Sequence, residues 1–439
     1  MFGTAVLLVT LFLTPAQAAP PAIAQFTLQN GMQVVVIPDH RAPVVTQMIW
    51  YKVGGMDDPP GHSGLAHFFE HMMFRGTKAA PGDAFSHTLA KNGGDDNAFT
   101  TQDYTAFFEQ LAADRLKLAM SLEADRMVHL DLSDAAVRTE RDVVLEERRM
   151  RVENSPQALA GEQVSAALYL SHPYGRPVIG WPLEVQRLDR AQAQSFYDRH
   201  YAPNNAILVI AGDVTPDAVK ADAAATLALV PARALEPRTV YAEPARLGET
   251  RLAIARPDAA VPSFSRVWRV PSYTTARPGQ AEALEVLAAM LGADANAVLY
   301  RQLVVEQKLA TDAGANYDGD ARNSGEFSIF AVPRPGVMLP ALEQAVDAIL
   351  AHYAAAPPAA ADLAHVKTQL VAGEVFRKDN QLSMASAYGQ ALAIGRTVAD
   401  VQDWPRRIEA VTPDSVRAAA AVVLDRKNAV TLYLTPGPA

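Results

Sequence analysis

The chain has 439 residues, and this length favours two domains of roughly 200 residues each. Its formal net charge is −9, with lysine and arginine scattered among the acids, which argues against nucleic acid as a partner. The absence of cysteine excludes disulfides, thiolate metal sites and a cysteine nucleophile, so histidines and carboxylates remain as the strong metal ligands.

The first 19 residues have the pattern of an export signal. An apolar run from Ala5 to Leu13 is followed by Thr14-Pro15 and then by the small residues Ala16-Gln17-Ala18. This order predicts cleavage after Ala18 or Ala19 and export, with the periplasm as the expected location. The run is too short to span a bilayer. No lysine or arginine precedes it, which departs from the usual pattern, and an uncleaved N-terminal anchor is the alternative.

Strand and helix patterns alternate along the first half. Residues Phe26–Ile37 alternate in polarity around the turn pair Asn30-Gly31, which predicts a hairpin, and an apolar strand follows at Val44–Val53. The next expected elements are helices at Leu65–Phe74, Asp114–His129 and Asp134–Glu153, with a strand at Asn97–Phe108. This alternation predicts an α/β sandwich.

A second unit follows a stretch rich in proline and arginine, Pro231–Gly248, which we expect to be a linker. Before it, a helix from Leu188 leads through a Tyr-Ala-Pro-Asn turn to a strand at Ile207–Ala211 and a glycine. Near the C-terminus, a helix after Val411 leads at the same spacing to a strand at Val430–Leu434 and a glycine. The repetition predicts an internal duplication, although helix, turn and strand also recur by chance in α/β chains.

The segment His67-Phe68-Phe69-Glu70-His71 carries the clearest chemical signal. In a helix, residues i, i+3 and i+4 share a face, so two imidazoles and a carboxylate converge. Imidazoles at this spacing suit Zn²⁺, and Glu70 is placed to take a proton from water that the metal activates. The alternative is a helix whose two histidines only lie beside a core stripe.

These residues resemble the inverted zinc motif of the pitrilysin family, which includes insulin-degrading enzyme and the mitochondrial processing peptidase. The resemblance extends over Gly64–Thr77 and continues in order through five more segments, which are Asn97-Ala98-Phe99-Thr100, Glu140–Glu147, His172-Pro173-Tyr174-Gly175, Tyr201–Asn205 and Gly212-Asp213-Val214. It covers nearly the whole first half and continues more weakly through the second. The chain is most similar to the zinc-bearing subunit of two-subunit members.

The resemblance implies a third zinc ligand at Glu147 and one Zn²⁺ per chain. Glu140, seven residues earlier on the same helix face, becomes a carboxylate that orients a ligating histidine. Glu146 is the rival ligand, but it lies about 100° further round the helix and is expected to face solvent. The other interpretation of Glu147 is an exposed i,i+4 pair with Arg151. The remaining histidines, including His62, His87 and His172, are expected to be surface or capping residues.

The resemblance also implies the fold and its boundaries. We expect the α+β class, with two similar α/β sandwich domains of the pitrilysin type related by internal duplication. The predicted boundaries are a signal peptide at 1–19, a zinc-binding catalytic domain at 20–232, a linker at 233–248 and a homologous domain without metal ligands at 249–439.

One part of the family pattern is missing. The second half of family members normally supplies an arginine and a tyrosine, seven residues apart, that hold the substrate carbonyl and its developing negative charge. Val304 and Thr311 occupy those positions here, and neither side chain can replace a guanidinium or a phenol. Arg266 and Tyr273 have the right separation but precede the helix, so we interpret that match as a coincidence.

The missing pair allows two interpretations. Either this subunit works with a homologous, metal-less partner that carries the arginine and the tyrosine, as the resemblance to two-subunit members of the family implies, or the site uses other donors and acts alone. We favour the partner. The heterodimer would enclose a chamber that admits peptides and unfolded segments. Substrate is expected to bind as an added strand along Asn97, Ala98, Phe99 and Thr100. The alternative from another functional class is a non-catalytic scaffold subunit, but such subunits are expected to lose metal ligands first, and the whole set is present here.

Overall fold

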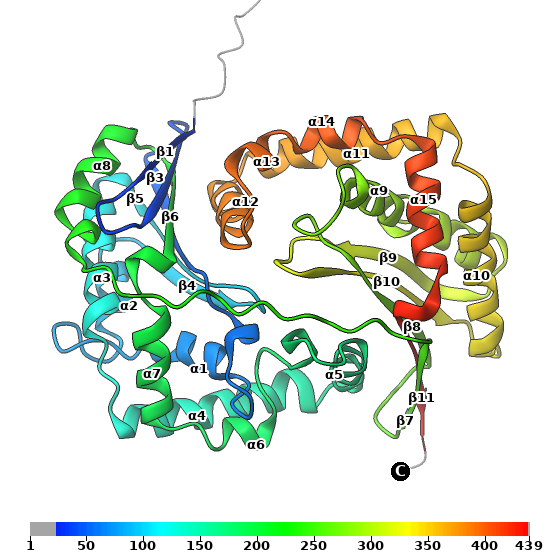
Figure 1. Ribbon diagram of the computed structural model, residues 1–439, viewed down its shortest axis with the longest axis horizontal. Helices are drawn as coiled ribbons and strands as arrows, with labels where there is room; N and C mark the ends of the chain where they lie inside the picture. Colours follow the sequence, from blue (N-terminus) through cyan, green and yellow to red (C-terminus); the bar gives the residue numbers. More distant parts are fainter. Residues whose placement is uncertain (1–22, 438–439) are drawn as a thin grey trace, which may run out of the picture.

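Two mixed β-sheets, one from each half of the chain, organise the structure, and Figure 1 shows them side by side with helices packed around them. The computed structural model describes residues 23–437, so the export signal predicted at 1–19 lies outside the described residues. Between residues 23 and 437, no helix combines the length and apolar character needed to cross a bilayer.

The first sheet has six strands in the order β1-β2-β6-β3-β5-β4. Its strands are β1 (Ala24–Thr27), β2 (Gln33–Pro38), β3 (Val44–Tyr51), β4 (Asp95–Thr100), β5 (Thr105–Ala112) and β6 (Ala206–Gly212). Only β2 and β6 pair in parallel, and the other neighbours are antiparallel. Strand β4 therefore forms one edge of this sheet and β1 the other.

The second sheet repeats this pattern without a counterpart of β1. Its order is β7-β11-β8-β10-β9, with β7 and β11 parallel and the rest antiparallel. The strands are β7 (Thr250–Arg256), β8 (Ser263–Pro271), β9 (Ala310–Asp318), β10 (Ser324–Pro333) and β11 (Ala429–Pro436). The shared order and strand directions show that the two halves are similar α/β domains.

Helices cover both sheets. Those of the first half are α1 (Leu65–Met72), α2 (Ala84–Lys91), α3 (Leu116–His129), α4 (Asp134–Arg148), α5 (Pro156–Leu168), α6 (Pro182–Val185), α7 (Arg190–His200) and α8 (Pro216–Ala225). Those of the second half are α9 (Gln280–Gly292), α10 (Leu339–Ala355), α11 (Ala360–Arg377), α12 (Gln381–Ala393), α13 (Val398–Gln402), α14 (Trp404–Glu409) and α15 (Pro413–Leu424). Between 231 and 248, the stretch expected to be a linker contains no helix or strand, and Figure 1 shows it crossing from one half to the other.

The two halves exchange one helix each. Helix α12 of the second half packs on β3 and β6, where Trp50 and Ile207 lie in one apolar cluster with Ala385 and Tyr388. Helix α5 of the first half packs on β7 and β11, where Val164 joins a cluster with strand residues of the second sheet. One helix from each half therefore covers part of the sheet of the other half, and the interface between the halves is apolar and buried.

The structure confirms the predicted hairpin at Phe26–Ile37 and the predicted helices, with one correction. Residues Asn97–Phe108, predicted as one strand, form the hairpin β4–β5. The Thr101 hydroxyl accepts the backbone N–H groups of Asp103 and Tyr104, which closes a turn in the middle of the segment. The turn makes β4 a separate edge strand, and β4 lies beside α1.

Candidate metal centre and active site

Helix α1 presents an apolar face to the sheet and a polar face to a cavity. Phe68, Phe69 and Met72 are fully buried in the core of the first domain, while His67 and His71 lie on the polar side. The 3.6-residue period of the helix places the apolar residues on one face and both histidines on the other. The same period therefore accounts for burial of the helix against the sheet and for the convergence of the histidines.

The N-terminus of α1 is fixed by a carboxylate that the motif did not reveal. Asp58 is fully buried, and its two oxygens accept the backbone N–H groups of Gly64 and Ala66, each at 2.8 Å. Gly64 has a φ of +89°, and a Cβ there would lie 2.8 Å from the Ile179 carbonyl oxygen, so glycine is required. Burial raises the pKa of Asp58 to about 8. This contact fixes the N-terminal end of α1, the helix that carries His67 and His71.

Glu147, on the last turn of α4, completes a three-residue cluster with the two histidines. Its Oε2 lies 3.6 Å from His67 Nε2 and 3.2 Å from His71 Nε2. One ligand atom from each residue can be chosen so that all lie within 4.8 Å of one another. Ligands bound at about 2.0–2.2 Å to a tetrahedral zinc are separated by roughly 3.3–3.6 Å, which is within about 0.1 Å of both Glu147 distances.

The cluster has the electrostatic character of a metal site. Glu147 Oε2 is buried and has no hydrogen-bond partner among the described residues, which is costly unless a cation completes it. Burial, together with the neighbouring His71, lowers the pKa of His67 to about 4, so its imidazole is neutral at pH 7. Neutral imidazoles and an ionised carboxylate are the forms that bind Zn²⁺. The residues present therefore fit a zinc ion.

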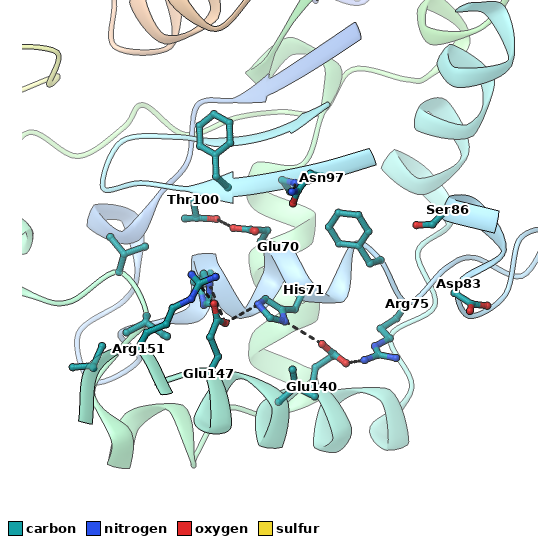
Figure 2. Close-up of a pocket in the computed structure, with 18 residues that line it drawn as sticks. Glu70, His71, Arg75, Asp83, Ser86, Asn97, Thr100, Glu140, Glu147 and Arg151 are labelled. Atoms are coloured by element: carbon teal, nitrogen blue, oxygen red, sulfur yellow. Dashed lines mark hydrogen bonds and ion pairs between the residues drawn. The ribbon is translucent and has the colours of Figure 1, made fainter. Parts of the chain in front are cut away.

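Glu140 lies behind His71. Its Oε2 is 3.3 Å from His71 Nδ1, and its Oε1 pairs with the Arg75 guanidinium. A proton on Nδ1 that is donated to Glu140 leaves the Nε2 lone pair directed to the cluster, which is the usual arrangement behind a ligating histidine. Figure 2 shows this row of side chains along α4, from Arg75 through Glu140 and His71 to Glu147.

Glu70 lies between the histidines and the edge strand. The Thr100 hydroxyl donates to Glu70 Oε2, as Figure 2 shows, and burial raises the pKa of the Glu70 carboxyl. A raised pKa brings a carboxylate closer to the value that suits a general base near neutral pH. The side chain is thus oriented by β4, the strand that the sequence predicts as the substrate-binding edge.

These groups line one cavity of about 720 Å³. Its lining includes the metal cluster, Glu70 and Glu140, the β4 residues Asn97, Ala98, Phe99 and Thr100, and Phe74, Arg75, Asp83, Ser86, Val143, Arg151, Val152, Val178 and Ile179. The structure therefore brings all of the predicted site residues together. We call this space the catalytic cavity.

Glu146 and Glu147, the two candidates for the third ligand, differ in the exposed fraction of their side chains. Glu146 is 53 % exposed in its side chain and pairs with Arg149, so it does not face the histidines. Glu147 is 13 % exposed and does pair with Arg151, whose Nη1 lies 2.7 Å from Oε1. The predicted i,i+4 ion pair is therefore present, but it uses one carboxylate oxygen and leaves the other directed to the histidines.

Among the residues that the structure describes, the second half contributes no arginine or tyrosine to the lining of the cavity. Val304 is buried in the core of the second domain, and the Thr311 hydroxyl donates to the Val332 carbonyl oxygen. Arg266 is fully buried and is held by Glu343, Asp347 and Thr431.

Tyr273 is also engaged elsewhere. Its hydroxyl donates to Glu285, and Trp404 Nε1 contacts the same oxygens. Neither Arg266 nor Tyr273 lines the catalytic cavity, in agreement with the interpretation of their spacing as a coincidence.

The other histidines are held by ordinary contacts. His87 is exposed and lies near Asp83, and His62 contacts the Pro60 carbonyl oxygen. His172 is buried, and its Nδ1 accepts the Tyr174 N–H at the start of a short 3₁₀ turn. It is a capping residue, as predicted.

Sequence reasoning missed several residues that fix α1 and α4. Besides Asp58, Glu184 accepts the Ser63 N–H, and Arg148 donates to Glu162 and to the Gly180 carbonyl oxygen beside Gly64. At Asp58 the local sequence is Asp57-Asp58-Pro59-Pro60-Gly61, and a pair of aspartates before two prolines does not by itself tell a buried carboxylate from an exposed one.

Two family models match the chain. The model described as insulinase (peptidase family M16) matches residues 33–181, and the model described as peptidase M16 inactive domain matches residues 187–370. Together they cover most of the sequence.

Curated relatives align over almost the whole chain. Zinc protease PqqE of Helicobacter pylori is 27% identical over 99% of this chain and 97% of its own length. An uncharacterised zinc protease of Mycobacterium tuberculosis is 30% identical over 94% of this chain and 93% of its own. A probable mitochondrial-processing peptidase subunit beta of Schizosaccharomyces pombe is 26% identical over 95% and 92%.

Solved structures agree on the fold. A protease from Helicobacter pylori superposes with a TM-score of 0.89 at 25% identity, covering 95% of this chain and all of that one. The periplasmic protease PqqL from Escherichia coli superposes with a TM-score of 0.79 at 20% identity, covering 94% of this chain and 47% of that one. A chain of this length therefore corresponds to about half of that larger protein.

Proposed function

The chain belongs to the M16 peptidase family, and from this premise we propose that it is the zinc-bearing subunit of an endopeptidase that hydrolyses peptides and unfolded polypeptide segments. The observation that carries the proposal is the buried, unpartnered Oε2 of Glu147 facing the two Nε2 atoms of His67 and His71. Its relatives are named zinc proteases, which supports peptide hydrolysis as the reaction.

In this proposal His67, His71 and Glu147 hold one Zn²⁺ per chain. Bound there, the ion supplies Lewis acidity that polarises a carbonyl and makes water more acidic. Glu70 accepts the proton that water loses and passes it to the departing amine, because its carboxyl lines the cavity beside the cluster without being one of the three proposed ligands. Thr100 keeps that carboxylate oriented through its hydroxyl.

Substrate binding is assigned to the edge of the first sheet. Strand β4 pairs with β5 on one side only, so along Asn97, Ala98, Phe99 and Thr100 the backbone N–H and C=O groups that point away from β5, on alternate residues, face an extended peptide. The Ala98 N–H donates to Asn97 Oδ1, and a peptide would replace this contact. A peptide added at this edge passes directly over Glu70, because Thr100 contacts both the strand ladder and that carboxylate. Backbone pairing of this kind recognises an unfolded segment without requiring one sequence.

The proposal includes a homologous partner subunit. The chain has no arginine and tyrosine at the positions of Val304 and Thr311, and a relative is named as a probable mitochondrial-processing peptidase subunit beta. A metal-less partner with that pair would complete the charge stabilisation. Export to the periplasm also belongs to the proposal, and it is supported by the signal-like pattern of residues 1–19.

Metal analysis of purified protein tests the proposal. We expect one zinc per chain, loss of zinc in His71→Ala, and full zinc with no hydrolysis in Glu70→Gln when the partner is present. His129→Ala serves as a matched control, because this exposed histidine pairs with Asp125 outside the catalytic cavity. Full zinc in His71→Ala, or loss of zinc in Glu70→Gln, would contradict the assignment of roles.

A further inference from the structure

The guanidinium of Arg151 occupies one oxygen of the proposed ligand Glu147. We infer that Arg151 is a positioning residue of the metal centre, which holds Glu147 Oε1 so that Oε2 alone is offered to the ion. The inference rests on the proposed function, since it assigns a role within the same zinc site. Figure 2 shows Arg151 beside Glu147 at the wall of the catalytic cavity.

The geometry of the carboxylate is asymmetric. Oε1 lies 2.7 Å from Arg151 Nη1, whereas Oε2 lies 3.2 Å from His71 Nε2 and 3.6 Å from His67 Nε2. A carboxylate with both oxygens free can bind zinc through either one or both. A cation on Oε1 removes that choice and favours binding through a single oxygen.

Arg151 is held where an irregular turn ends helix α4. Residues Arg149–Glu153 form a π-helical turn, and the Asn154 N–H donates to the Arg149 carbonyl oxygen five residues earlier. Such turns widen a helix and are frequent at functional sites. Arg151 and Val152 of this turn both line the catalytic cavity, so the turn forms part of its wall.

A neighbouring pair shows that this contact differs from an ordinary surface ion pair. Arg149 pairs with Glu146 in the same turn, but both side chains are more than half exposed and lie outside the cavity. The Arg151 side chain is also exposed, at 73 %, but its partner Glu147 is only 13 % exposed. A charge pair in which the carboxylate is buried is screened much less by water than one in which both groups are solvated.

Charge also favours the role. Within the lining of the catalytic cavity the cationic side chains are Arg75 and Arg151, and Arg75 is already paired with Glu140. Arg151 is therefore the cation available to Glu147. Loss of a group that holds a ligating carboxylate commonly weakens metal binding by about 10- to 100-fold.

Zinc affinity measured by competition with a chromophoric chelator tests the inference without any assay of activity. We expect Arg151→Gln to weaken zinc binding by about 10- to 100-fold and Arg151→Lys to recover part of that loss, because a lysine keeps the charge but not the planar fork. Arg149→Gln, the matched control on the same turn, should bind zinc as the unmodified protein does.

Two results would overturn the inference. One is equal zinc affinity in Arg151→Gln and the unmodified chain, and the other is an equal loss in Arg149→Gln, which would reveal a general charge effect. Failure of the unmodified chain to bind zinc would instead refute the proposed function. Because Arg151 is largely exposed, its replacement should leave the unfolding transition of the zinc-free protein unchanged, and this measurement confirms that the variant is folded.

Discussion

The isolated chain should hydrolyse unfolded peptides very slowly even when it is fully loaded with zinc. The reason lies in the second domain, where neither Val304 nor Thr311 offers a donor to a developing oxyanion. Val304 is an apolar core residue, and the Thr311 hydroxyl is bonded within its own sheet. The two other candidates, Arg266 and Tyr273, are bonded to carboxylates of their own domain, Glu343 and Glu285.

The size of the effect follows from the number of missing donors. Removal of one donor aimed at an oxyanion commonly lowers kcat by about 10² to 10³, or roughly 2.7–4 kcal/mol. Two missing donors give an upper limit of about 10⁴ to 10⁶, and groups that act as a unit usually fall short of that product. We therefore expect a deficit of at least about 10²-fold in the isolated chain.

A fluorogenic unfolded peptide provides the assay. Hydrolysis by the zinc-loaded chain alone is compared with hydrolysis after addition of a homologous subunit that carries the arginine and the tyrosine. Changing either of those two partner residues should abolish the gain and leave the zinc content of this chain unchanged. Activity of the isolated chain within tenfold of the pair would refute the reasoning, because it would show that this sequence contains its own oxyanion donors.

Three further predictions concern single residues. Glu140→Gln removes the carboxylate that orients a ligating histidine, and a chelator competition should show zinc affinity reduced by about 10- to 100-fold, whereas an unchanged affinity would exclude that role. In Gly389→Ala the new Cβ would lie 2.0 Å from Trp50 Nε1, so urea unfolding should show a loss of about 3 kcal/mol, while Gly373→Ala on α11 meets no atom within 4 Å and should show none. Burial lowers the pKa of His200 to about 4, so the folded state favours the neutral imidazole and stability is lost as the pH falls from 6.5 towards 4. His200→Gln should reduce the difference in unfolding free energy between pH 7 and pH 5 by up to about 2 kcal/mol, and an unchanged difference would contradict this.

Most of the metal cluster could be predicted from the sequence. His67, Glu70 and His71 lie within one helical turn, so the 3.6-residue period alone places them on one face. Glu147 was assigned through resemblance, and the helix period excluded Glu146 because neighbouring residues point in different directions. Exposure in the structure agrees with that choice.

Other contacts could not be predicted, because they depend on how irregular or distant segments fold. Asp58 is six residues from Gly64, but it reaches the N-terminus of α1 through a loop without a regular pattern, and Arg75 meets Glu140 on another helix. The single strand expected at Asn97–Phe108 proved to be a hairpin, because Thr101 forms turn contacts that the apolar pattern does not record. The predicted boundaries at 20–232, 233–248 and 249–439 stay predictions.

By itself, the sequence determined the face of α1 that carries the histidines, the duplication of the helix-turn-strand unit, and the presence of Val304 and Thr311 where the family has an arginine and a tyrosine. These are local features, set by side-chain periodicity and by residue type. Only the tertiary structure decided which oxygen of Glu147 is free, which of the two histidines Glu140 contacts, and how α5 and α12 are exchanged between the sheets. Those depend on the packing of segments that are distant in the chain, and close packing selects among arrangements that share the same local pattern.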